Sequence, residues 1–193
     1  FSNNEIYNYY NDISNSSNLP IIVYNISQAN LMDLDTLKRL ASIKNIKGVK
    51  YTAPTHFNFS KIKKEISDDF KIYSGMDEMA LSGIISGADG MIGSFYNLMP
   101  EMFVSLFNQL QKGDINEAKK IQEKINIIIV YALEKSGYPF IKMGMNWLGI
   151  DSGYVRRPFV SITDTDVENE IKKDLQILIK ENDLSGIKFL EGL

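Results

Sequence analysis

Cysteine is absent from the 193-residue sequence, and histidine occurs once, at His56. The lack of cysteine excludes disulfides and thiolate chemistry, which is compatible with the reducing cytoplasm where we expect the protein to reside. A catalytic zinc needs several clustered His, Cys or carboxylate ligands, so a single histidine without such a cluster argues against a metal site. His56 is not accompanied by a G-x-S-x-G nucleophile elbow, and we predict that it is a loop or surface residue rather than a catalytic base.

Long apolar runs and a strong excess of one charge are also missing. The most apolar segment, residues 125–133, is interrupted by Asn126 and followed by charged residues, so it is too short to span a membrane. The formal net charge is only -3, and the lysines near position 63 are interleaved with acidic residues in the manner of a solvated helix face. We therefore expect neither a membrane nor a nucleic-acid partner. The 44% of hydrophobic residues suffices for a globular core.

Strand and helix patterns alternate through the first part of the chain. Ser2 and Glu5 have the spacing of a capping box that opens a helix. Short apolar strands are predicted at residues 21–25, 48–52, 70–74 and 90–94, and amphipathic helices at 33–43, 59–66, 78–86 and 100–110. Strands that alternate with helices indicate βα crossovers and a parallel sheet. Beyond Gly113 only helices are predicted, at 115–136, 139–148 and 166–182, the last behind a capping box of Thr165 and Glu168.

These patterns predict the last four βα units of a TIM (β/α)8 barrel at residues 1–112 and a C-terminal helical extension at 113–193. A complete barrel has eight strands and about 250 residues. The sequence also opens with Phe1 rather than Met, so we expect an N-terminal half of the barrel that lies outside it. The alternative is a small open sheet of the flavodoxin type, although no Gly-rich phosphate loop supports a nucleotide-binding version.

Polar residues follow each predicted strand, at the barrel end where catalytic groups are found. Lys50 is the most informative of them, because burial of an ammonium is costly and favours the free amine that attacks a ketone. The residues alone leave plainer interpretations open. Lys50 could hold its amine in water, Tyr24 could be a core tyrosine, and Asp77 and Glu78 could be favourable charges in the first turn of a helix.

Four segments, in order and with fitting spacing, resemble the dihydrodipicolinate synthase / N-acetylneuraminate lyase family of class I aldolases, on the N-acetylneuraminate lyase side. The segments are residues 19–26 (LPIIVYNI), 48–52 (GVKYT), 73–78 (YSGMDE) and 86–97 (SGADGMIGSFYN). The string RRPF at residues 156–159 in the helical tail fits as well.

The resemblance implies a homotetrameric barrel that cleaves N-acetylneuraminate (sialic acid) to N-acetylmannosamine and pyruvate, with no metal or cofactor beyond a lysine Schiff base. It implies that Lys50 is the nucleophile, Tyr24 the acid/base group, and Thr52 a hydrogen-bonding residue near the reacting carbonyl. It also implies contacts to the sugar chain from Gly75, Asp77, Glu78 and Ser94.

Departures from the neighbouring dihydrodipicolinate synthases refine this expectation. Those enzymes usually carry an arginine a few residues after the strand tyrosine, whereas residues 26–30 here contain none. They tend to follow the lysine with Glu-Ala, whereas Tyr51 and Thr52 stand here, and Ser27 replaces the family's usual proline. The family's pyruvate-carboxylate loop and its relay tyrosine from a neighbouring subunit belong to the half that we expect outside this sequence. Another pyruvate-dependent aldolase or synthase, such as a 2-keto-3-deoxy sugar acid aldolase, and an inactive binding paralogue therefore stay open.

Overall fold

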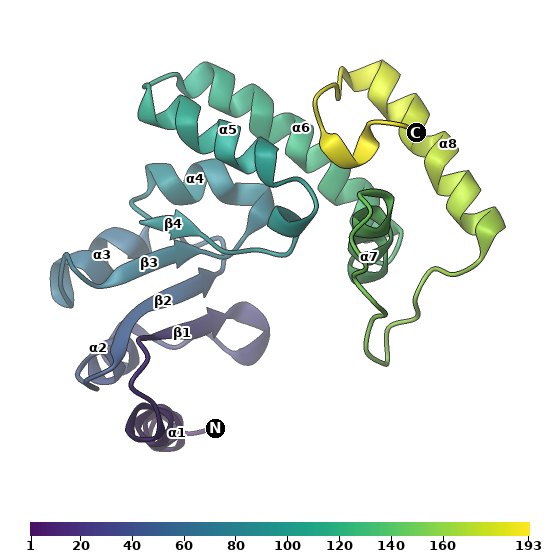
Figure 1. The fold of residues 1–193 in the computed structure, drawn as a ribbon. Helices are drawn as coiled ribbons and strands as arrows, with labels where there is room; N and C mark the ends of the chain where they lie inside the picture. The colour runs from purple at the N-terminus through teal and green to yellow at the C-terminus, as the bar shows by residue number, and fades with distance from the viewer. The chain divides into compact units, whose positions relative to one another are not determined.

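The computed structural model describes residues 1–193 and divides into two compact units, Phe1–Ile92 and Gly93–Leu193 (Figure 1). The first unit contains the sheet, and the second is helical. The boundary expected from the βα pattern, at residue 112, lies inside the second unit, between α5 (Pro100–Gln111) and α6 (Ile115–Glu134). The two boundaries differ because α5, the last helix of the βα pattern, packs along α6 and so belongs to the helical unit.

The first unit carries four parallel strands, as the alternation of strand and helix predicted, and their order β1-β2-β3-β4 is the one that the half-barrel prediction requires. Its elements are α1 (Asn3–Ser16), β1 (Ile21–Ile26), η1 (Ser27–Ala29), α2 (Leu34–Ala41), β2 (Ile46–Thr52), α3 (Asn58–Glu65), β3 (Lys71–Ser74), η2 (Asp77–Met79), α4 (Ala80–Ile85) and β4 (Gly90–Met91).

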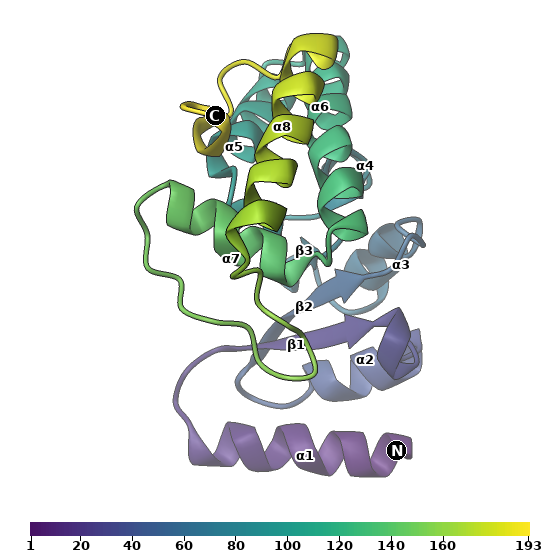
Figure 2. The same cartoon turned by 90° about the vertical axis from the view of Figure 1, so that its right-hand side faces the viewer.

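Local signals in the sequence start the helices of this unit. Ser2 and Glu5 form the predicted capping box of α1, since each backbone N–H is bonded by the other's side chain. Asp33 caps α2 by accepting from the Thr36 N–H at 2.8 Å. Figure 2 shows α2 and α3 on the same face of the sheet. Between these helices and the sheet lies an apolar core that includes Val23, Leu37, Leu40, Val49, Phe59, Ile62 and Ile72.

Two predicted elements are shorter than expected. The strand predicted at 90–94 pairs only at Gly90 and Met91, because its partner β3 ends at Ser74 and offers one further acceptor, the Ser74 carbonyl that receives the Ile92 N–H. The helix predicted at 78–86 begins as the 3-10 turn η2 and becomes α-helical only at Ala80.

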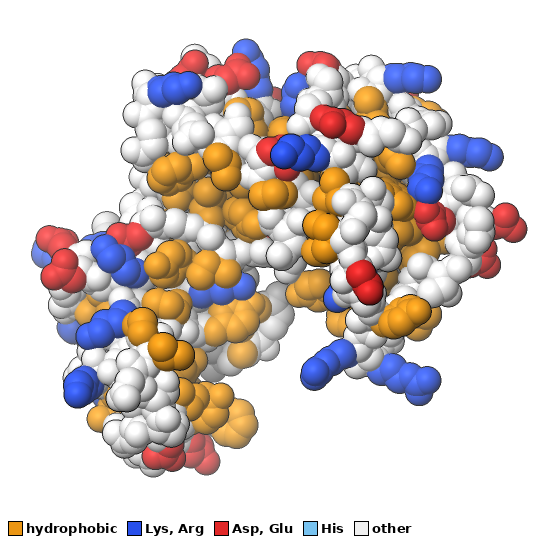
Figure 3. Space-filling model, in the orientation of Figure 1, with side chains coloured by type: hydrophobic (Ala, Val, Ile, Leu, Met, Phe, Trp, Pro, Cys, Tyr) orange, Lys and Arg blue, Asp and Glu red, His pale blue; other side chains and the backbone are white.

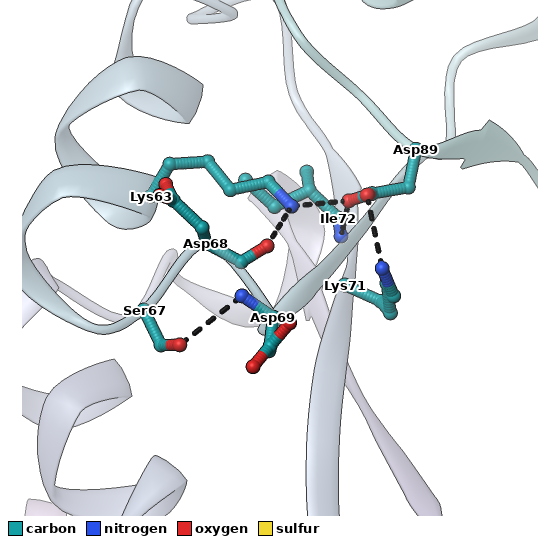
Figure 4. Close-up of polar contacts among 7 residues, drawn as sticks. All are labelled: Lys63, Ser67, Asp68, Asp69, Lys71, Ile72 and Asp89. Carbon is teal, nitrogen blue, oxygen red and sulfur yellow. Dashed lines mark hydrogen bonds and ion pairs between the residues drawn. The ribbon is translucent and has the colours of Figure 1, made fainter.

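An ionic cluster joins β3 to β4 at the amino-terminal ends of these two strands (Figure 4). One carboxylate oxygen of Asp89 accepts from the Lys63 ammonium at 2.7 Å and from the Ile72 N–H at 2.8 Å, and the other lies 3.5 Å from the Lys71 ammonium. Burial acts to raise the pKa of Asp89, but these hydrogen bonds and the two positive charges outweigh burial and hold the pKa below its ordinary value. Asp89 therefore stabilises the sheet as a charged group.

The second unit consists of η3 (Phe95–Asn97), α5, α6, α7 (Tyr138–Trp147), α8 (Thr165–Asn182) and η4 (Lys188–Leu190). The predicted capping box of α8 at Thr165 is wrong. Asp164 caps this helix instead, and Glu168 accepts from Trp147 at 2.8 Å and pairs with Lys172. No helix in either unit has the length and apolar character needed to cross a membrane.

Candidate functional site

The site begins with a row of side chains across three strands. In the parallel register Tyr24 of β1 lies opposite Lys50 of β2, and Lys50 lies opposite Tyr73 of β3. Successive side chains on a strand alternate between faces, so these three share one face, while their buried neighbours face the helices. The row therefore stands on the face of the sheet that α2 and α3 do not cover.

Lys50 and Tyr24 are direct neighbours. The Lys50 ammonium lies 4.5 Å from the centroid of the Tyr24 ring, in cation–π geometry. Tyr24 is 46% exposed in this chain, so its ring does not belong to the apolar core between the sheet and its helices. Lys50 is half-buried, between the two possibilities that the sequence left open. The amine of Lys50 and the phenol ring of Tyr24 are thus placed side by side.

Gly75, immediately after β3, is needed for space beside Lys50. A Cβ atom at this position would lie 2.0 Å from Oγ1 of Thr52 and 3.0 Å from Cε of Lys50. Any side chain larger than hydrogen would displace one of these groups. Oγ1 of Thr52 is itself buried and has no hydrogen-bond partner in the protein. Because a buried hydroxyl without a partner is costly, Thr52 is suited to bond a molecule that reaches Lys50.

The remaining predicted contacts divide into two groups. Asp77 is buried, with 6% exposed, and Glu78 beside it in η2 is exposed, so the two carboxylates occupy different environments. Both lie in the first turn of that 3-10 helix, as the plainer interpretation had it. Ser94 is the N-terminal flanking residue of η3 and belongs to the second unit. The first unit thus brings together Tyr24, Lys50, Thr52 and Gly75.

A hollow of about 460 Å³ lies against Tyr24, between α1 and the end of β1. Lys50 does not line it, and its walls are mostly apolar and aromatic. Tyr10 of α1 forms part of this wall and accepts the Tyr24 N–H through its hydroxyl at 3.2 Å. Burial raises the pKa of Tyr10, so this hydroxyl stays protonated at neutral pH. Nowhere in the structure do three or more His, Cys, Asp or Glu side chains gather in a way that could hold a metal ion.

His56 was expected to be a loop or surface residue, and the structure separates these two possibilities. It lies in the loop between β2 and α3, as expected, and is buried there, with 3% of its surface exposed. Its ring stacks on Phe59 with centroids 5.0 Å apart, and burial lowers its pKa. The sequence signal for this burial was Phe59, an aromatic residue three positions further on, against which the His56 ring packs.

Comparison with known proteins assigns the chain to a family. The family model for the Dihydrodipicolinate synthetase family matches residues 1–178. The chain is 34% identical over 168 residues to the N-acetylneuraminate lyase of Rhizobium meliloti, covering 86% of this chain and 56% of that protein. It superposes on N-acetylneuraminate lyase from Fusobacterium nucleatum, solved with pyruvate, with a TM-score of 0.80 and 32% identity over 90% of this chain and 60% of that one.

Dihydrodipicolinate synthase from Aquifex aeolicus gives a TM-score of 0.79 at 24% identity and shows the same fold. The sheet and these matches define the chain as part of a TIM (β/α)8 barrel with C-terminal helices, of the class I aldolase kind. The chain belongs to the Dihydrodipicolinate synthetase family, whose members are lyases. It spans a little over half the length of the relatives that it matches.

Proposed function

We propose that this chain is the C-terminal part of an N-acetylneuraminate lyase, which cleaves sialic acid to N-acetylmannosamine and pyruvate through a Schiff base on Lys50. The observation that carries the proposal is the neighbourhood of Lys50, with the Tyr24 ring over its amine and the Thr52 hydroxyl and Gly75 beside its carbon chain. The names and identities of the relatives support this choice of substrate.

The chemistry follows from those groups. The Lys50 amine attacks the ketone of the open-chain sugar and, with loss of water, forms a protonated imine. Tyr24 gives its proton to the departing hydroxide as the imine forms. The resulting phenolate then takes the proton of the hydroxyl next to the bond that breaks, and the electrons of that carbon–carbon bond move into the imine to give an enamine. Protonation of the enamine and hydrolysis release pyruvate and restore the amine. Thr52 supplies a hydrogen bond near the reacting carbonyl.

Glu78 and Asp77 provide acceptors for the hydroxyls of the sugar chain, together with Ser94 and the Gly75 backbone. We also propose that the active protein is a cytoplasmic homotetramer and that an N-terminal half supplies the remaining strands and the carboxylate-binding loop. The length of the relatives supports that half, since this chain covers 56% of the Rhizobium meliloti protein.

Borohydride trapping tests the nucleophile. The complete protein is incubated with pyruvate and borohydride, which reduces the imine to a stable secondary amine, and peptide mass mapping locates the added mass. We expect the label on Lys50, no label in Lys50→Ala, and full labelling in Lys47→Ala, which removes an exposed lysine from the same strand. Label on Lys47 or Lys142, or no label, would show that the nucleophile is wrongly assigned.

A substrate panel tests the reaction. The complete protein is given sialic acid, 2-keto-3-deoxygluconate, or pyruvate with aspartate semialdehyde, and product formation is followed in each. We expect turnover of sialic acid. The absence of an arginine among residues 26–30 favours this outcome over the synthase reaction. Turnover of another substrate would identify a related aldolase or synthase, and binding without turnover an inactive paralogue.

A further inference from the structure

His56 is a buried titratable side chain that the proposed chemistry does not use. Its Nδ1 atom lies 3.0 Å from Oγ of Ser82 in α4. Its Nε2 atom is buried and has no hydrogen-bond partner. The bond to Ser82 is therefore the only hydrogen bond that fixes the ring. Burial lowers the pKa of His56, and a neutral ring can accept from or donate to the hydroxyl through Nδ1.

On one side, the ring is connected to the strand that carries Lys50. His56 stacks on Phe59, and Phe59 meets the ring of Tyr51 edge-on, with centroids 5.4 Å apart. Tyr51 follows Lys50 directly in β2. The Tyr51 hydroxyl is bonded to Thr55 at 2.8 Å and to Asn58 at 2.9 Å, so the loop after β2 is held closely to its strand.

On the other side, His56 meets the contact between α4 and β3. A Cβ atom at Gly83 of α4 would lie 2.3 Å from Oγ of Ser74 and 3.8 Å from Cε1 of His56. The helix thus touches the last residue of β3 next to the histidine ring. Gly75 follows Ser74, and the space left by its missing side chain is filled by Lys50 and Thr52. α4 therefore contacts the residue next to Gly75, and Gly75 lies against Lys50.

We propose that His56 is a positioning residue that, through its hydrogen bond to Ser82, holds α4 and the end of β3 at the separation that Lys50 requires. The inference rests on the proposed function, because it assigns to Lys50 the reaction described above. His56 does not touch the substrate. It acts by joining three segments, the loop after β2, the end of β3 and α4.

Steady-state kinetics of the complete protein with sialic acid tests the inference, using His56→Phe, Ser82→Ala and the double variant. Phenylalanine keeps the stacking and loses the bond. We expect kcat to fall on the order of tenfold in each single variant while KM changes less than about twofold, since misplacement of the reacting group slows chemistry more than binding. The double variant should be no slower than the slower single variant, because both remove one bond. His56→Asn, whose amide can reach Ser82, should regain most of kcat.

Two controls separate positioning from general loss of stability. Ser86→Ala changes a serine at the end of the same helix whose side chain makes no hydrogen bond, and kcat should be unchanged. Ile46→Val creates a small cavity at the other end of β2 and lowers the melting temperature without touching His56. The inference is overturned if His56→Phe and Ser82→Ala keep wild-type kcat, or if Ile46→Val loses as much kcat for the same fall in melting temperature. A wild-type protein that neither traps pyruvate nor cleaves sialic acid would overturn the proposed function, and this inference with it.

Discussion

At the scale of single residues, the proposed chemistry depends on which atoms surround the Lys50 amine. Tyr24 contributes a ring that stands over the ammonium and a hydroxyl that can carry a proton. Tyr24 lies outside the apolar core between the sheet and its helices, so the two roles can be separated by mutation.

Tyr24→Phe keeps the ring and removes the proton carrier. We expect the complete protein to fold as the wild type does and to lose roughly 100-fold or more in turnover, the usual scale for one acid/base group. Pyruvate trapping at Lys50 should persist, since the ring over the amine is retained. Thermal melting and steady-state kinetics with sialic acid check both parts. Near-normal turnover would return Tyr24 to a structural role.

Asp77 and Glu78 should determine sugar specificity rather than bond cleavage. We expect Asp77→Asn and Glu78→Gln each to lower kcat/KM for sialic acid. The loss should correspond to about 1–3 kcal/mol of transition-state stabilisation, the scale of a disrupted charge-assisted hydrogen bond. Pyruvate trapping should survive, because pyruvate has no polyol chain. Glu78→Gln should also melt as the wild type does because Glu78 is exposed, whereas Asp77 is buried. Loss of trapping in either variant would make the carboxylates structural or directly catalytic.

At the scale of secondary-structure elements, the Asp89 cluster in Figure 4 should stabilise the pairing of β3 with β4. Asp89→Asn should lower the free energy of unfolding by about 1–2 kcal/mol, because the bonds to Lys63 and Ile72 lose their charge. Asp69→Asn, in the nearby turn, is the matched control, because its side chain makes no ion pair or hydrogen bond and stability should be unchanged.

The effect of Asp89 should depend on pH in a definite direction. The pKa of Asp89 is lowered in the folded state, so its contribution is complete above the ordinary carboxyl pKa of about 3.9 and disappears as the pH falls through the folded-state pKa. Urea denaturation of the complete protein should therefore show the full difference between wild type and Asp89→Asn at pH 6 and a smaller one below about pH 4. An equal difference at both pH values would contradict a role for the charge.

Elements were predictable from sequence where the pattern was local and regular. The capping box at Ser2, the parallel arrangement of the strands and the strand that carries Lys50 follow from hydrophobic spacing, cap chemistry and the alternation of strand and helix. The wrong predictions concern the ends of elements, where tertiary contacts decide which residue caps a helix and where a strand stops. Asp164 rather than Thr165 caps α8 because Glu168 is bonded to Trp147 and Lys172, and β4 is short because β3 ends at Ser74.

The candidate site was predictable only in part from local sequence patterns. The sequence placed Lys50 after an apolar run, but family resemblance, not spacing, singled out Tyr24 and Thr52. The partnerless Thr52 hydroxyl and the close approach of Gly75 to Lys50 are three-dimensional facts with no periodic signal. The hydrogen bond of His56 to Ser82, which is 26 residues further along the chain, has no such signal either.

At the scale of the whole molecule, the first unit has two outer strands, β1 and β4, and a face that no helix of that unit covers. Figure 3 shows apolar side chains gathered over β1 to β3. Tyr24, on this face, is 46% exposed. Its backbone N–H donates to the Tyr10 hydroxyl instead of to another strand. Open strand edges and exposed apolar surface favour association with other chains.

We therefore expect the isolated 193-residue chain to aggregate and to trap no pyruvate, and co-expression with the N-terminal half to restore both solubility and trapping. Size-exclusion chromatography and borohydride labelling measure the two properties separately. Lys50→Ala in the same co-expression is the control: it should restore solubility without trapping, because folding needs the added strands and the reaction needs the amine. An isolated chain that elutes as a single discrete species and is labelled at Lys50 would show that the four strands form a complete site, contrary to the half-barrel proposal.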